Sequence, residues 1–86
     1  MPLSLQKMKE YFVYAIKSKK DNRIYVGISN NITRRIKEHN LGKTPSTKAY
    51  IPWVLIHKRI FNSRFEARKE EKKLKSGYGK EFLKSI

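Results

Sequence analysis

The sequence predicts an α+β domain in which one small, three-stranded antiparallel sheet is flanked by helices, in the order β-β-α-β-α-α. Two apolar stretches, 11–16 and 23–28, are separated by a polar turn, as in a β-hairpin. A helical pattern then precedes a third strand-like stretch at 52–61. The rest of the chain has helical spacing, and strands followed by helices indicate the α+β class.

The two stretches of the predicted hairpin differ in pattern. Tyr11–Ile16 is a continuous run of apolar, aromatic and β-branched residues, which is typical of a strand covered on both faces and therefore central. Lys19–Asn22 has the composition of a turn. Arg23–Ile28 completes the hairpin, and Gly27 within it predicts a bulge or the close approach of another backbone.

The first helix is expected to begin after Ser29–Asn31, which offers N-cap residues, and to end at Gly42. Its apolar side is marked by Ile32, Ile36 and Leu41. The following segment, 43–50, contains lysine, proline, serine and threonine, and we expect an exposed basic loop there.

Pro52 suits the first position of the third strand, because proline cannot donate to a sheet ladder. Ser63 and Glu66 have capping-box spacing and predict the start of a second helix that ends near Ser76 and is broken by Gly77. Residues 79–86 are expected to form a last short helix.

The chain has 86 residues, which predicts one domain over 1–86, with 1–9 as a loosely ordered leader. It has no cysteine, so disulfides and thiolate metal sites are excluded. No apolar run approaches the roughly 20 residues of a membrane span, and the leader lacks a signal-peptide core. We expect a cytoplasmic monomer without membrane contact.

Net charge is the strongest compositional signal. Twenty-one Lys and Arg face seven Asp and Glu, for a net charge of +14. The basic residues run from Lys7 to Lys84, so they belong to the folded domain rather than to a tail. This excess favours a polyanionic partner, with nucleic acid first, an anionic membrane surface second and a solvated surface without a partner third.

Any divalent metal would have to use one of few carboxylates, because Mg²⁺ prefers oxygen ligands. The seven are Glu10, Asp21, Glu38, Glu66, Glu70, Glu71 and Glu81. Mg²⁺ often needs only one or two carboxylates plus substrate phosphate. The pair Glu70–Glu71 shares a side of the second helix with Ala67 and Leu74, which indicates a metal-binding carboxylate or a boundary glutamate paired with a lysine. Spacing does not separate the two glutamates.

Arg35 and His39 are four residues apart, so both project from one face of the first helix. On their own they fit a surface arginine and a histidine placed by the helix dipole better than a phosphate clamp with a proton carrier. Tyr14 and Tyr25 lie on the two strands of the hairpin, where tyrosines usually pack the core.

Several of these segments together resemble the GIY-YIG nuclease family, from about Tyr11 to Ile86. Phe12-Val13-Tyr14 and Tyr25-Val26-Gly27 are similar to its two signature triplets, although Phe12 and Val13 replace Gly and Ile. The stretch 66–75 is similar to its metal-binding helix. Two further segments, around Pro52-Trp53 and Lys75-Ser76-Gly77, are similar to its compact stand-alone branch, which is akin to the catalytic domain of excision-repair nucleases.

The resemblance implies a metal-dependent endonuclease that hydrolyses nucleic-acid phosphodiester bonds in DNA repair or recombination, on DNA rather than RNA. Its register selects Glu71 for a Mg²⁺ or Mn²⁺ ion. Its implied catalytic residues are Tyr14, Tyr25, Arg35 and His39, with Gly27 structural. We expect Lys43, Lys48 and Lys75 to contact the backbone of the nucleic acid.

Two other functions fit the same residues. A non-catalytic nucleic-acid-binding module needs the basic surface and aromatic residues but not Glu71. A basic domain that docks onto a partner in a larger complex would bind no naked nucleic acid. Metal-dependent cleavage separates the nuclease from both.

Overall fold

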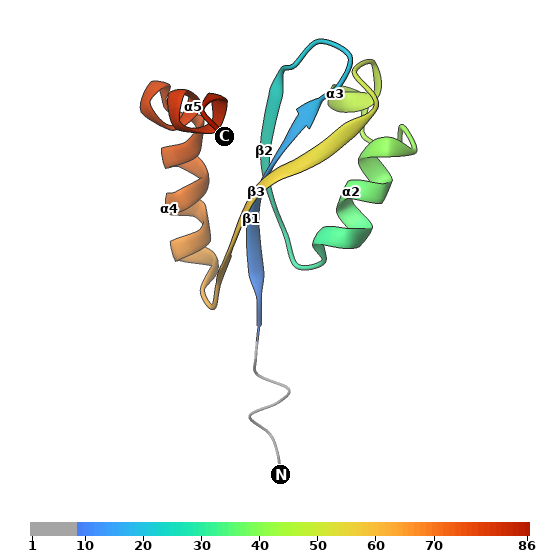
Figure 1. Cartoon of the computed structure of the whole chain (residues 1–86). Coiled ribbons are helices and arrows are strands. Elements are labelled where there is room, and N and C mark those ends of the chain that lie inside the picture. The colour runs from blue at the N-terminus through green and yellow to red at the C-terminus, as the bar shows by residue number, and fades with distance from the viewer. Residues whose placement is uncertain (1–8) are drawn as a thin grey trace.

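The computed structural model describes residues 9–86 and confirms the α+β class, with a three-stranded antiparallel sheet between helices (Figure 1). The predicted leader, apart from residue 9, lies outside the described residues. The elements are β1 (Tyr11–Ser18), β2 (Ile24–Ser29), α2 (Ile32–Asn40), α3 (Pro45–Lys48), β3 (Trp53–Phe61), α4 (Arg64–Lys75) and α5 (Gly77–Lys84).

The sheet order is β2-β1-β3, and both pairs are antiparallel, so β1 is central as its continuous apolar run predicted. Side chains alternate along β1. Val13 and Ala15 face α4 and α5, whereas Tyr14 and Ile16 face α2. Figure 1 shows α4 and α5 on one side of the sheet and α2 and α3 on the other. The domain therefore has a separate core on each face of one sheet.

The helix ends follow the predicted signals. The Asn31 side chain accepts a hydrogen bond from the Arg34 N–H at the start of α2, and Ser63 accepts one from Glu66 at the start of α4. Gly42 has a φ of 77°, the left-handed conformation that favours glycine after a helix end. Local capping chemistry thus defines where both long helices begin.

The predicted exposed loop at 43–50 is wrong in part, because it contains the short helix α3. Pro45 occupies the first turn of this helix, where its missing N–H costs nothing, and Thr44 precedes it as the N-cap residue. Thr47 within α3 is buried. Pro45, which can indicate a loop, here begins a helix.

The last helix also begins earlier than predicted, at Gly77 rather than Gly79, and ends at Lys84. Ser76 ends α4 and caps α5 by accepting a hydrogen bond from the Gly79 N–H. Gly79 is buried because α5 crosses α4 closely there, and a Cβ on it would collide with the backbone of Lys73 and Leu74. None of the helices within residues 9–86 is long and apolar enough to cross a membrane.

Candidate active site

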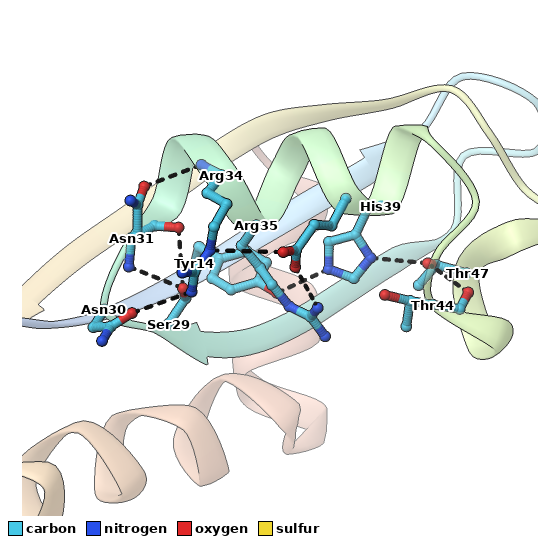
Figure 2. A network of polar contacts seen from close by, with 10 residues as sticks. Tyr14, Ser29, Asn30, Asn31, Arg34, Arg35, His39, Thr44 and Thr47 are labelled. Carbon is cyan, nitrogen blue, oxygen red and sulfur yellow. Dashed lines mark hydrogen bonds and ion pairs between the residues drawn. The ribbon is translucent and has the colours of Figure 1, made fainter.

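A buried polar contact joins the central strand to the first helix of the structure. The Tyr14 hydroxyl on β1 lies 2.9 Å from Nε2 of His39 on α2. The two side chains are almost fully buried, at 1% and 0% exposure. Figure 2 shows them pointing toward one another below α2. The sequence placed His39 on the face of Arg35, and packing of α2 on β1 turns that face onto Tyr14.

The hydrogen bonds continue from His39 to α3. His39 Nδ1 lies 2.8 Å from Thr47 Oγ1, which itself donates to the Thr44 carbonyl at 3.3 Å (Figure 2). We assign the Thr47 hydroxyl proton to that bond, and with this assignment the Thr47 oxygen accepts from His39 Nδ1–H. His39 Nε2 is then an acceptor, and the Tyr14 O–H donates to it. The chain Tyr14–His39–Thr47 therefore has a defined direction.

Gly27 makes room for this arrangement. A Cβ on it would lie 2.8 Å from the Tyr14 hydroxyl oxygen and 3.1 Å from the Tyr25 ring. The sequence predicted a bulge or a nearby backbone at this glycine, and this is wrong. The β1–β2 register is regular, and the neighbour is the Tyr14 side chain. The absence of a side chain at Gly27 thus leaves room for the side chains of Tyr14 and Tyr25.

Tyr25 on β2 lies beside the buried chain and is partly exposed. Its ring centroid is 5.0 Å from that of His39 and 6.4 Å from that of Tyr14. Within residues 9–86 no hydrogen bond links Tyr25 to His39, whose two nitrogens are taken by Tyr14 and Thr47. Tyr25 is therefore the more exposed of the two tyrosines, and both nitrogens of His39 are engaged with other residues.

Arg35 adds positive charge at the edge of this group. Its guanidinium Nη1 lies 2.9 Å from Glu38 Oε1. Burial and the neighbouring Tyr25 raise the pKa of Tyr14 to about 12, although the Arg35 charge opposes this. Burial and the Arg35 charge lower the pKa of His39. At neutral pH the structure thus holds a protonated tyrosine, a neutral imidazole and one arginine.

Glu71 lies on α4, which packs on the opposite face of the sheet from α2. Its carboxylate faces two cations, with Oε2 at 3.0 Å from Lys75 Nζ and Oε1 at 4.0 Å from Arg68 Nε. In the described part of the chain no ion pair or hydrogen bond connects it to the tyrosines. The structure therefore brings together four of the five predicted catalytic and metal residues, with Glu71 apart.

One groove approaches both parts of the site. It runs between the edge strand β2 and helix α5, has a volume of about 480 Å³, and is lined by both Tyr25 and Lys75. Lys75 is also the ion-pair partner of Glu71. Glu70, by contrast, lines pockets with Arg59 of β3. Glu71 thus pairs with a residue that lines the groove beside Tyr25, whereas Glu70 pairs with Arg59 of β3, a difference that spacing along the helix did not reveal.

A metal at Glu71 would have one carboxylate from the chain. No cluster of three or more His, Cys, Asp or Glu side chains able to hold a metal exists among residues 9–86. A single oxygen ligand fits Mg²⁺, which keeps several waters and binds through one or two carboxylates plus substrate phosphates. The donor set therefore suits a metal that binds together with the substrate.

The predicted backbone-binding lysines are all exposed but are distributed over different elements. Lys43 follows α2 and is close enough to Glu38 to help lower the pKa of that carboxyl, after the larger effect of Arg35. Lys48 ends α3, and Lys75 ends α4.

Sequence reasoning missed Thr47 and Glu38, which hold His39 and Arg35 in place. Glu38 had a signal, because it is three residues after Arg35 on the same helix. Thr47 had a weaker signal, because Thr44 and Pro45 have the pattern of a helix start that would place Thr47 in its first turn.

The sequence model of the family described as the GIY-YIG catalytic domain matches residues 10–84 of this chain. The chain belongs to the GIY-YIG family. The family is one of nucleases, and membership indicates nucleic acid as the class of substrate. A UPF0213 protein from Staphylococcus haemolyticus is 38% identical over 80 residues, which cover 92% of this chain and 96% of the relative. Another from Listeria welshimeri is 40% identical over 68 residues, or 78% of this chain and 74% of the relative.

A solution NMR structure of a UPF0213 protein from Bacillus halodurans has a similar fold. It is 34% identical, with a TM-score of 0.54, and the match covers 88% of this GIY-YIG chain and 83% of that one. The match supports the arrangement of strands and helices described above.

Proposed function

We propose that this GIY-YIG chain is a metal-dependent endonuclease that hydrolyses phosphodiester bonds, with DNA as its substrate in repair or recombination. The observation that carries the proposal is the gathering of Tyr14, Tyr25, Arg35 and His39 from β1, β2 and α2 around one centre. The net charge of +14 suits a polyanionic substrate. A single chain carries all the proposed residues, in keeping with a monomer.

The two tyrosines have different parts in this proposal. Tyr14 stays protonated at neutral pH, because burial raises its pKa to about 12, and it donates to His39. It is therefore a positioning residue and not a base. Tyr25 is partly exposed and would orient the attacking water through its hydroxyl.

Arg35 would stabilise the charge that develops on the phosphate. Its guanidinium is held by Glu38 at 2.9 Å, so its position is set before the substrate binds. His39 keeps the Tyr14 hydroxyl in place through a chain that ends at Thr47.

Glu71 would hold a Mg²⁺ or Mn²⁺ ion, which acts as a Lewis acid on phosphate oxygens when bound. The Lys75 ammonium, 3.0 Å from the carboxylate, would then be free to pair with a phosphate. A substrate lying along the groove that Tyr25 and Lys75 share would contact both parts of the site.

Nicking of supercoiled plasmid DNA tests this function. Wild-type protein should nick with Mg²⁺ and not with EDTA, and Glu71→Gln should lower the rate by about 100-fold or more. Glu70→Gln is the matched control, since it removes the same charge from the adjacent position and should keep most of the activity. Equal activity of wild type and Glu71→Gln would exclude the metal role of Glu71.

A second function, a non-catalytic nucleic-acid-binding module, is favoured by one observation. The Glu71 carboxylate already has two cationic partners, Lys75 and Arg68. Retained binding without cleavage of any DNA or RNA by the pure protein would select this function. Failure to bind naked nucleic acid would instead indicate a domain that docks onto a partner.

A further inference from the structure

A small pocket lies between β3, α4 and α5, and none of Tyr14, Tyr25, Arg35 and His39 lines it. We propose that it binds one unpaired base of a nucleic acid together with its phosphate. The pocket has a volume of about 200 Å³. This is below the roughly 300–1,000 Å³ of a site for a drug-sized molecule, so it suits a single ring system. The inference depends on nucleic acid as the partner of this chain but not on its cleavage.

The pocket lies on the sheet face opposite Tyr14. His57 and Arg59 of β3 pair directly with Ala15 and Val13 of β1, so their side chains point to the same face as these two residues. Both Ala15 and Val13 belong to the core beneath α4. A strand bound here would contact the protein at a place separate from Tyr14.

His57 has an unused hydrogen-bonding atom in this pocket. Its Nε2 is shielded from solvent and has no hydrogen-bond partner among residues 9–86. The ring lies edge-on against Phe82, with 5.4 Å between the centroids. Buried polar atoms normally have a partner, and an imidazole nitrogen can donate or accept. The edges of a base offer both kinds of group, and because Nε2 is shielded, the His57 ring has to turn toward the pocket to make this bond.

Two aromatic side chains of α5 flank the pocket and are unusually open. Tyr78 is 76% exposed and Phe82 is 45% exposed, and they are one helical turn apart. Gly79 between them lets α5 lie directly against the α4 backbone, where a Cβ has no room. Aromatic faces of this kind stack with unpaired bases in proteins that bind single strands.

The charge of the pocket suits a phosphate. Arg59 lies 3.6 Å from Glu70, which is 11% exposed, so these two charges offset one another. Lys73 also lines the pocket and forms no ion pair with any described residue. The lining therefore carries one uncompensated positive charge beside an aromatic surface. This combination matches a nucleotide and disfavours a cationic ligand.

Binding of a labelled thymidine oligonucleotide of about eight nucleotides, measured in EDTA by fluorescence anisotropy, tests the pocket. Tyr78→Ala should weaken binding of this single strand by about 5- to 100-fold, because one stacked base is lost. Its affinity for duplex DNA should stay within about twofold of wild type. Phe65→Ala, which removes another exposed aromatic side chain outside the pocket, should leave both affinities unchanged.

A second measurement follows His57 itself by NMR. Its ring signals should shift when the oligonucleotide is added to wild type and should stay in place with Tyr78→Ala. Equal loss of binding in Tyr78→Ala and Phe65→Ala, no loss in either, or unmoved His57 signals would overturn the proposal. Because EDTA prevents metal-dependent cleavage, the result does not depend on catalysis: a protein that nicks DNA can fail here, and one that never nicks can pass.

Discussion

Gly27 and Tyr14 face each other across the β1–β2 pair, so closely that a Cβ on Gly27 would lie 2.8 Å from the Tyr14 hydroxyl oxygen. That hydroxyl is the atom that donates to His39. The space left by one missing side chain thus determines where the buried polar chain begins.

Gly27→Ala should therefore displace the Tyr14 ring and destabilise the protein by about 1–3 kcal/mol, as overpacking of a filled core does. It should also lower the nicking rate, because Tyr14 would no longer hold its place beside Tyr25. Urea unfolding and the plasmid assay measure the two effects. Gly77→Ala is the control, since a Cβ there meets no atom within 4 Å and α5 begins at this residue. Equal stability of the two variants would contradict the steric argument.

The buried imidazole predicts a loss of stability in mild acid. Burial, and then the Arg35 charge, lowers the pKa of His39 in the folded state. The unfolded chain therefore takes up a proton near pH 6.5 that the folded chain does not. The contribution of His39 is fully present above that pH and is lost as the pH falls, by at most about 1.4 kcal/mol for each pH unit.

Thermal unfolding at pH 7.5 and 5.5 measures this effect, with His39→Gln as the comparison. Glutamine does not titrate, so the variant should lose less stability than wild type over this range. His57 is present in both proteins and cancels. A pH dependence as steep in His39→Gln as in wild type would show that another group is responsible.

Much of the fold was predictable because its signals are local. The continuous apolar run marked β1 as central, and the capping residues Asn31 and Ser63 marked the starts of α2 and α4. Helix α3 was missed because Pro45 indicates a loop as readily as a helix start. The residue preferences of a short segment predict its structure only when they favour one conformation over the others.

The site depends on contacts that no local pattern contains. Tyr14 and His39 are 25 residues apart, and their bond exists because α2 packs on the face of β1 that Tyr14 occupies. Glu70 pairs with Arg59 of β3, whereas Glu71 pairs with Arg68 and Lys75 of its own helix, a difference that is set by how α4 packs on the sheet. Residue types and order could suggest the candidates, whereas packing determines their neighbours.

Arg35 and its neighbour Arg34 offer a matched test of transition-state stabilisation. Both are paired with Glu38, at 2.9 Å and 3.6 Å, but Arg35 lies beside the buried Tyr14 and Arg34 is more exposed. Arg35→Gln should lower the cleavage rate by about 100-fold or more, and Arg34→Gln by far less, although both remove one positive charge. Single-turnover cleavage at saturating DNA measures the rate apart from binding. Equal effects would assign both arginines to general attraction of the substrate.

Salt dependence of binding tests the groove between β2 and α5. Lys75 lines it together with Tyr25, whereas Lys72 of the same helix is exposed outside it. If Lys75 neutralises one phosphate, Lys75→Ala should reduce the slope of log K against log salt by about 0.9 on duplex DNA. Lys43→Ala and Lys48→Ala should reduce the slope as Lys75→Ala does, because both lysines are expected to contact phosphates. Lys72→Ala removes the same charge and should leave the slope unchanged. A uniform decrease for all four variants would mean that the nucleic acid responds to net charge rather than to a path that passes Tyr25.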